Sequence, residues 1–262
     1  MNKVEKPEWT PSAIEEWVSS QDGADYWYQT IPIRYGIVTP GTVDSRKRFE
    51  RFDLPHDLRG KSVLDVGCNS GMIALECKRR GASRVVGIDL QRNRLEQART
   101  LAHIMQLDIA FTEMDLLDAR RLGQFDLVFC IAVLTEVADL IGGLNALMDV
   151  TRHTLYLEIA TLETFPRYLP FLTGGVQQLL HLSAADIYAF VSQRLRRKGS
   201  RSPLCGTARL RRIDSRLMRG WSLVPNKSLL RSITEEQFRM SDLGISERYN
   251  LLRFDRKPDC DK

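Results

Sequence analysis

Residues 63–71 read Val63-Leu64-Asp65-Val66-Gly67-Cys68-Asn69-Ser70-Gly71 and combine the signals of a strand, a turn and a helix start. The first four residues form a short, mostly apolar run of the kind that a buried strand requires. Gly67 then permits a tight turn, and Gly71 leads into a stretch with helical spacing of apolar residues. We therefore expect a strand, a glycine-containing turn and a helix whose first N–H groups are unpaired and face a polar ligand.

Outside this stretch, short apolar runs alternate with amphipathic helical stretches. Strands are expected at 62–66, 84–89, 108–112, 125–131, 154–160, 243–245 and 250–254. Helices are expected at 72–77, 95–105, 137–150 and 226–238. This alternation predicts an α/β protein with a Rossmann-like, doubly wound and mostly parallel seven-stranded sheet.

The expected elements divide the chain into four parts. Residues 1–60 hold a helix that starts at Thr10-Pro11 and an aromatic segment, which together form an N-terminal strap. Residues 61–160 form the Rossmann-like core, and residues 221–262 add a helix and strands that complete its sheet. The interval 161–220 is a basic insertion, and it is too long for a structureless loop, so we expect it to carry helices.

Composition and charge limit the function classes. The chain has 262 residues, with 43% apolar and 27% charged residues, which is typical of a soluble globular protein. Its five cysteines include no CxxC pair, so neither a zinc site nor a disulfide framework is indicated. The N-terminus lacks a signal-peptide core, and the most apolar stretch, 168–182, is broken by proline and glycine. We expect no membrane span and a cytoplasmic location.

The net charge of +5 is concentrated in one segment, residues 191–219, which holds ten Arg or Lys residues and one acid. Arginine suits phosphate or carboxylate oxygens, so this segment would bind an anionic glycan, a nucleotide-linked sugar or RNA. A solvated loop is the alternative. Because the segment is nearly free of aromatic residues for base stacking, RNA is the less favoured partner.

The pattern DxGxNxG at 65–71 is followed by Asp89 at a strand end, Asp115 after the third strand and Asp126 in the fourth. Over roughly residues 60–160 this order resembles the class I S-adenosylmethionine-dependent methyltransferases. Nucleotide dehydrogenases carry GxGxxG instead. The resemblance implies a methyltransferase of class EC 2.1.1 with S-adenosyl-L-methionine as cofactor and no metal.

Carried over by position, the resemblance also implies a cofactor site. The loop at 65–71 would lie under the methionine part, Asp89 would hold the ribose, and Asp115 would accept from the adenine amino group. Asn69 replaces the usual glycine, and asparagine is the non-glycine residue that best tolerates a left-handed backbone. The implied residues are Asp65, Gly67, Cys68, Asn69, Gly71, Asp89, Leu90, Asp115, Leu116, Cys130 and Ile131.

A narrower resemblance rests on Thr39-Pro40-Gly41 and on Leu223-Val224-Pro225-Asn226 before a Ser228-Leu229-Leu230 helix. These motifs are similar to the branch of tRNA wobble-uridine carboxymethyltransferase-like proteins. That branch follows the fourth strand with Val-Leu-Tyr-His, whereas this chain has Val133-Leu134-Thr135-Glu136. The missing aromatic argues against a carboxylated cofactor, so we expect the ordinary methyl donor.

A general base is needed only if the acceptor must lose a proton, and it must lie at the carboxyl ends of the strands. Three residues are candidates for this catalytic role: Glu158, Glu136 and His181. Each has a structural alternative, as a hydrogen-bond acceptor or as a packed side chain. His153 and His56 precede strands and belong to the other edge of the sheet.

The aromatic segment of the strap offers candidates for the acceptor pocket, namely Trp27, Arg34 and Tyr35, or else it only stabilises the sheet. We expect methyl transfer to an O or N atom of a polar small molecule or glycan, anionic ones included. A tRNA-modifying methyltransferase is one alternative, and a non-catalytic cofactor-binding regulatory or partner-binding protein is another. The sequence does not determine the oligomeric state.

Overall fold

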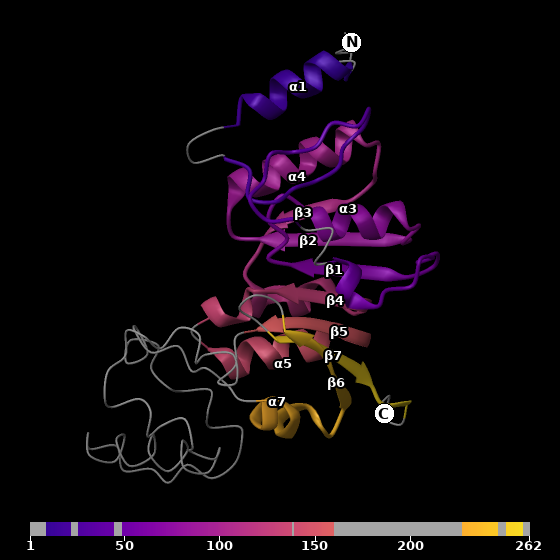
Figure 1. Ribbon diagram of the computed structural model, residues 1–262. Helices are drawn as coiled ribbons and strands as arrows, with labels where there is room; N and C mark the ends of the chain where they lie inside the picture. The colour runs from indigo at the N-terminus through magenta and orange to yellow at the C-terminus, as the bar shows by residue number, and fades with distance from the viewer. Residues whose placement is uncertain are drawn as a thin grey trace, which may run out of the picture. The chain divides into compact units, whose positions relative to one another are not determined.

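The computed structural model describes residues 9–21, 26–44, 49–137, 139–159, 227–245 and 250–258. Its helices and strands alternate along the chain as predicted (Figure 1). The predicted insertion at 161–220, with His181 and the basic segment 191–219, lies outside the described residues.

Seven strands form one sheet in the order β3-β2-β1-β4-β5-β7-β6, which confirms the predicted Rossmann-like architecture. Their bounds are β1 Ser62–Val66, β2 Arg84–Asp89, β3 Ala110–Glu113, β4 Phe125–Ile131, β5 Thr151–Ile159, β6 Phe238–Ile245 and β7 Asn250–Arg256. β1 pairs with β2 and β2 with β3 in parallel, whereas β7 is antiparallel to both β5 and β6.

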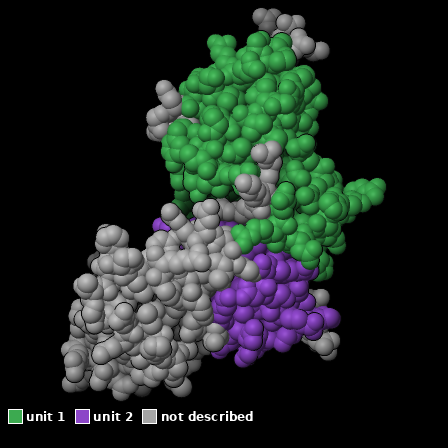
Figure 2. Space-filling model, in the orientation of Figure 1, with its two compact units in different colours: residues 1–129, 150–153 green, residues 130–149, 154–262 purple. Residues whose placement is uncertain are grey.

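The α-helices are α1 Pro11–Ser19, α3 Met72–Arg79, α4 Arg92–Ile104, α5 Leu140–Val150 and α7 Lys227–Thr234. Three short 3-10 segments are η2 Glu50–Phe52, η3 Leu116–Leu122 and η4 Leu134–Glu136. The chain divides into two compact units, which Figure 2 colours separately. Unit 1 comprises residues 1–129 and 150–153, and unit 2 comprises residues 130–149 and 154–262.

Unit 1 is built on β1, whose residues are almost all buried, as its apolar run predicts. The strap packs against α4 through residues at both ends of α1. The rings of Trp9 and His103 meet edge to face, with 6.4 Å between their centroids, a separation common for aromatic pairs. Gln97 Nε2 donates to Gln21 Oε1 at 3.4 Å. α1 therefore lies along α4 in the opposite direction.

In unit 2, the helix predicted at 226–238 is shorter than expected. It ends at Thr234, and Phe238 instead begins β6, which is longer than the predicted strand at 243–245. Phe238 lies four residues after Thr234 and therefore fits helical spacing too. Pairing with β7, where Phe238 lies opposite Arg256, and burial of the Phe238 side chain favour the strand.

Candidate cofactor site

The turn after β1, residues 67–71, alternates left-handed and ordinary backbone. Gly67, Asn69 and Gly71 have φ values of 68°, 52° and 86°. Asn69 thus adopts the left-handed conformation expected for it, and its side chain stabilises the turn by accepting from Ser70 N at 2.8 Å. We call residues 67–71 the cofactor loop.

Backbone hydrogen bonds attach the cofactor loop to the end of β2. Ile88 O accepts from Gly67 N at 2.8 Å and from Cys68 N at 3.0 Å. The loop closes on itself where Gly71 N donates to Cys68 O at 2.8 Å. These contacts hold the loop beside the strand end that carries Asp89.

The start of α3 differs from the expectation of unpaired N–H groups. Met72 N donates to Gln29 Oε1 of the strap at 3.3 Å, and Ala74 N donates to Asp65 Oδ2 at 3.2 Å. That expectation is therefore wrong for these two donors, because side chains distant in sequence satisfy them. The N–H groups of Met72 and Ala74 are therefore not available to an anion. What the cofactor loop offers a ligand is a backbone that it can approach closely.

Asp89 ends β2 with each carboxylate oxygen accepting one backbone N–H. Oδ2 accepts from Asn69 N at 2.8 Å, and Oδ1 accepts from Gln91 N at 2.8 Å. A carboxylate oxygen accepts two hydrogen bonds, so one position on each oxygen is left for a ligand. Because Asp89 is only partly buried, this fixed carboxylate fits the two hydroxyls of a ribose.

Asp115 and its neighbours follow β3 at the same edge. Met114 N donates to Asp89 O at 3.1 Å, which connects the ends of β2 and β3. Asp115 caps η3 by accepting from Leu117 N at 2.8 Å through Oδ1. Leu116 is buried, whereas Leu90, next to Asp89, is 65% exposed. The structure thus brings these four residues of the predicted site together with the cofactor loop in unit 1.

Asp65 lies behind the cofactor loop and is 2% exposed. Desolvation by burial raises the pKa of Asp65 to about 7, with a further raising contribution from the charge of Asp89. Burial likewise raises the pKa of the Cys68 thiol well above its ordinary value. Cys68 is therefore a packing residue of the loop and not a reactive thiolate.

Close packing fixes two glycines near the loop. A Cβ atom on Gly71 would lie 2.9 Å from Phe111 Cζ, and one on Gly87 would lie 2.7 Å from the same ring. Phe111, in β3, therefore occupies the space that side chains at these positions would need. Gly71 was predicted as the start of the helix and as a cofactor residue, whereas the packing role of Phe111 was not predicted, because spacing along the chain offers no signal for it.

A buried polar network below the loop was also missed. Ser70 Oγ donates to Gln97 Oε1 at 2.8 Å, and Arg94 donates to the same oxygen at 3.2 Å. Ser70, Arg94 and Gln97 are each at most 3% exposed. Arg94 also donates to Tyr26 O and lies over the Tyr26 ring. The network joins the cofactor loop to α4 and the strap, and polar residues beside the apolar stripe of α4 were its only signal.

The remaining predicted cofactor and catalytic residues of the described chain belong to unit 2. Cys130 is fully buried at the end of β4, and Ile131 follows it half-buried. Glu158 of β5 is fully buried, and its backbone oxygen accepts from Ala132 N at 2.9 Å, which brings the ends of β4 and β5 together. Glu136 is exposed in η4.

The predicted acceptor residues of the strap lie elsewhere in unit 1. Trp27 is 3% exposed, packs edge-on against Trp17 and donates from Nε1 to Val18 O at 2.9 Å. Arg34 and Tyr35 lie at the carboxyl end of α4, where Arg34 donates to Ile104 O at 3.4 Å. The structure does not bring these three residues together with Asp89.

The described residues offer neither a metal site nor a membrane-spanning helix. Within the described ranges, no group of three or more His, Cys, Asp or Glu residues is arranged to hold a metal ion. Among the helices of the described part of the chain, none is long and apolar enough to cross a membrane.

Comparisons with known proteins agree with this geometry. A model of the methyltransferase domain family matches residues 63–154. The ubiquinone biosynthesis O-methyltransferase of Alkalilimnicola ehrlichii is 32% identical over 128 residues, which are 48% of this chain and 51% of that protein. The protein of the same name from Psychrobacter cryohalolentis is 31% identical over 189 residues, covering 66% of this chain and 71% of that protein.

The chain spans about half the length of the first of these relatives. The crystal structure of EvdMO1 superposes with a TM-score of 0.56 and 16% identity, over 94% of this chain and 48% of that chain. This likeness concerns the fold alone. None of these matches singles out the tRNA wobble-uridine carboxymethyltransferase branch. With the family model, the relatives and the strand order in agreement, the chain belongs to the class I S-adenosylmethionine-dependent methyltransferases.

Proposed function

We propose that this protein transfers the methyl group of S-adenosylmethionine to an O or N atom of a polar small molecule or glycan, anionic ones included. The observation that carries the proposal is the carboxylate of Asp89, fixed by Asn69 N and Gln91 N with one acceptor position left on each oxygen. Family membership supports the reaction type.

The residues around Asp89 suit a nucleoside. The exposed Leu90 offers an apolar surface for an adenine ring, and Asp115 keeps Oδ2 outside its capping hydrogen bond to Leu117 N. An adenine amino group would donate to that oxygen. When bound, S-adenosylmethionine supplies an activated methyl group on its sulfonium. The remaining task of the chain is to align the acceptor, which is worth roughly 7–11 kcal/mol in well-oriented reactions.

For the acceptor side, Glu158 is the described residue that best suits a general base or a positioning role. It lies fully buried where β4 and β5 end, at the carboxyl edge where such sheets bind ligands. Glu136, exposed in η4, is the second candidate for this role. The relatives are named as O-methyltransferases of ubiquinone biosynthesis, which favours an oxygen acceptor on a small molecule.

Calorimetric titration with S-adenosylhomocysteine tests the cofactor assignment. The wild-type protein should bind with a measurable affinity, and Asp89→Ala should weaken binding about 100-fold, the loss of two charge-assisted hydrogen bonds. Asp118→Ala is the matched control, since Asp118 is a partly exposed acid in η3 paired with Arg121. Equal affinity in the two variants would contradict the role of Asp89.

Turnover separates an enzyme from a non-catalytic binding protein. Methyl release from S-adenosylmethionine should appear with phenolic or glycan acceptors, and Glu158→Gln should reduce the rate without abolishing cofactor binding. RNA is the alternative acceptor, based on the basic segment 191–219. It requires RNA affinity that falls steeply with salt, so salt-independent or absent RNA binding excludes it.

A further inference from the structure

A cavity of unit 1, about 790 Å³ in volume, lies at the far end of α4 from Asp89. Its walls come from the start of α1, the turn of the strap and the segment between α4 and β3. The lining residues include Trp9, Arg34, Tyr35, His103, Gln106 and Asp108. α4 has 13 residues and is therefore about 20 Å long. Because Asp89 precedes its first residue, the cavity is separate from the cofactor loop.

Arg34 places a cation in this cavity, and it forms no ion pair with any acid of the described residues. Its only hydrogen bond with the described residues runs from Nη1 to Ile104 O at 3.4 Å, a long contact. The guanidinium lies over the Tyr35 ring, 5.0 Å from its centroid. Most of its donors are therefore left for a carboxylate or phosphate, the groups that a guanidinium binds with two parallel hydrogen bonds.

Tyr35 is held in a strained conformation beside that cation. Tyr35 and Gly36 have φ values of 58° and 76°, and Ile37 N donates to Arg34 O at 3.0 Å, which closes a tight hairpin turn. Glycine or asparagine is favoured at the position of Tyr35, and a bulky residue there is strained by about 1–3 kcal/mol. Tyr35 as a whole is nevertheless 58% exposed, so it is not kept for packing.

Trp9, at the start of α1, is a second aromatic residue that lines the cavity. The Trp9 ring meets His103 edge to face at 6.4 Å and Trp17 at 6.0 Å. The Trp9 indole N–H is buried and donates to no described group. A buried donor without an acceptor lowers the stability of the folded state by about 1–3 kcal/mol. Strained and unsatisfied groups of this kind concentrate where a ligand binds.

We infer that this cavity is a binding site for a planar aromatic anion, with the ring between Tyr35 and Trp9 and the anionic group on Arg34. Asp108 also lines the cavity, so the anionic group is expected on the Arg34 side and a neutral or donor group near Asp108. A ligand there lies about the length of α4 from the cofactor loop, so it is an effector and not the methyl acceptor.

Arg34 also has a structural reading, because a cation is favourable at the carboxyl end of a helix such as α4. That role explains the contact with Ile104 O. The helix-end role of Arg34 does not explain why a tyrosine takes the strained, exposed position next to Arg34, where glycine would adopt the positive φ without steric strain. The two readings predict different behaviour of Tyr35→Gly.

The test is titration of the full chain with 2-naphthoate, using 2-naphthamide as the uncharged counterpart. We expect 2-naphthoate to bind about tenfold more tightly than the amide, and Arg34→Gln to remove that preference. Arg121→Gln, at an exposed arginine of η3, should leave both affinities unchanged. Excess S-adenosylhomocysteine should not displace the probe.

Tyr35→Gly gives the second measurement. Relief of strain should raise the melting temperature of the variant while its affinity for 2-naphthoate falls at least about fivefold, since the stacking ring is lost. Absence of saturable 2-naphthoate binding, equal affinities in Arg34→Gln and Arg121→Gln, or displacement by S-adenosylhomocysteine would each overturn the inference. A Tyr35→Gly protein that melts lower would support the purely structural reading.

Discussion

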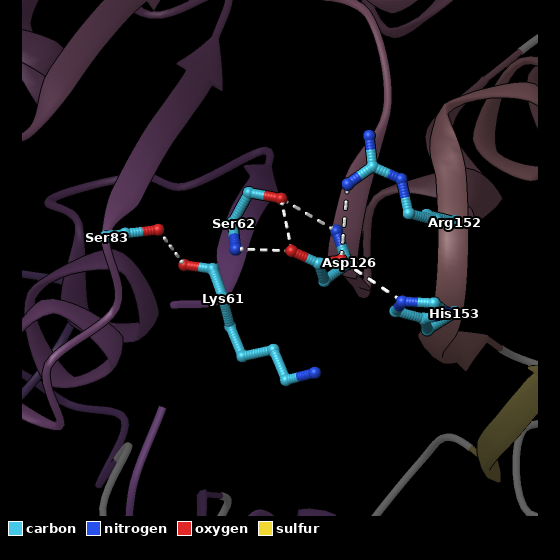
Figure 3. Close-up of polar contacts among 6 residues, drawn as sticks. All are labelled: Lys61, Ser62, Ser83, Asp126, Arg152 and His153. Atoms are coloured by element: carbon cyan, nitrogen blue, oxygen red, sulfur yellow. Dashed lines mark hydrogen bonds and ion pairs between the residues drawn. The ribbon is translucent and has the colours of Figure 1, made fainter. Parts of the chain in front are cut away.

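Two aspartates at opposite edges of the sheet in unit 1 are surrounded by hydrogen-bond donors in different ways. Asp89 ends β2 and accepts two backbone N–H groups, one on each oxygen. Asp126 is the second residue of β4, at the edge where β1 begins. Its carboxylate accepts three hydrogen bonds, and the His153 ring lies at ion-pair distance from it (Figure 3). The first carboxylate retains capacity for a ligand, and the second has almost none.

The donors to Asp126 come from two strands. Ser62 of β1 donates from both N and Oγ to Oδ2 at 2.7 Å. Arg152 Nη1 and His153 Nε2, at the start of β5, lie 3.4 and 3.3 Å from Oδ1. Asp126 N in turn donates to Ser62 Oγ at 3.0 Å. This cluster stabilises the amino ends of the strands. His153 lies there as the third residue of β5, and not before the strand as predicted.

The contrast teaches that acidity at a strand end does not by itself indicate a ligand site. Asp89 is partly exposed and has spare capacity to accept hydrogen bonds. The Asp126 side chain is only 10% exposed, and most of its acceptor positions are already occupied by protein donors. Substitutions at three positions of unit 1, Asp65, Asp126 and Asn69, separate these two kinds of carboxylate environment.

The largest effect is expected at Asp65, which shares the edge of Asp89 but is buried. Its pKa is raised from an ordinary value near 4 to about 7, so the folded state binds a proton more tightly than the unfolded state. Folding stability should therefore fall as pH rises from about 4 to 7, by about 2–3 kcal/mol between pH 5 and 7. Asp65→Asn keeps an acceptor for Ala74 N and should remove this slope.

Urea unfolding at several pH values measures the Asp65 effect. The variant should be more stable than the wild type at pH 8, and the two should converge near pH 4. A wild-type profile that is flat between pH 5 and 7 would contradict the assignment. Asp118→Asn, at a partly exposed acid, serves as the control and should leave the wild-type slope in place.

The second effect is expected at Asp126. Asp126→Ala should lower the free energy of unfolding at pH 7 by about 2 kcal/mol, because Ser62 N loses its acceptor in a partly buried position. The affinity for S-adenosylhomocysteine should be unchanged, in contrast to Asp89→Ala. An equal loss of cofactor affinity in the two variants would remove the distinction between the two edges.

The Asp126 effect also has a pH signature opposite to that of Asp65. Burial raises the pKa of Asp126, but hydrogen bonds from Ser62 and the charges of Arg152 and His153 outweigh it, so the pKa is lowered overall. The stabilisation from Asp126 is therefore complete above its ordinary pKa near 4 and is lost as pH falls through its lowered value. Wild type and Asp126→Ala should approach each other in stability only in that acidic range.

Local pattern was sufficient to predict the fold and to place Asp89 and Asp115 after neighbouring strands. The run at 63–71 led to β1, the turn and α3, and the left-handed backbone of Asn69 followed from its residue type. The contacts that were missed join distant parts of the chain, such as Gln29 with Met72 N, 43 positions apart. Which side chain satisfies a helix start across such a separation depends on tertiary packing, and periodicity carries no information about it.

The smallest effect is expected at Asn69, whose left-handed backbone and side-chain hydrogen bonds contribute separately to the cofactor loop. Asn69→Ala places a Cβ-bearing residue without a local hydrogen bond at φ 52° and should cost about 1–2 kcal/mol of stability. Asn69→Gly removes the steric cost and loses only the bonds to Ser70, so it should cost less.

Gln106 provides the matched control, because it has φ 57° but lies after α4, away from the cofactor loop. Gln106→Gly and Gln106→Ala should differ in stability in the same direction as the Asn69 pair, with no change in S-adenosylhomocysteine affinity. At Asn69, affinity should also fall, and more for alanine than for glycine, because the loop positions the N–H that fixes Asp89 Oδ2. Equal affinity of Asn69→Ala and wild type would show that Asp89 is held in place without the loop, and the preorganisation ascribed to this edge would then belong to Gln91 alone.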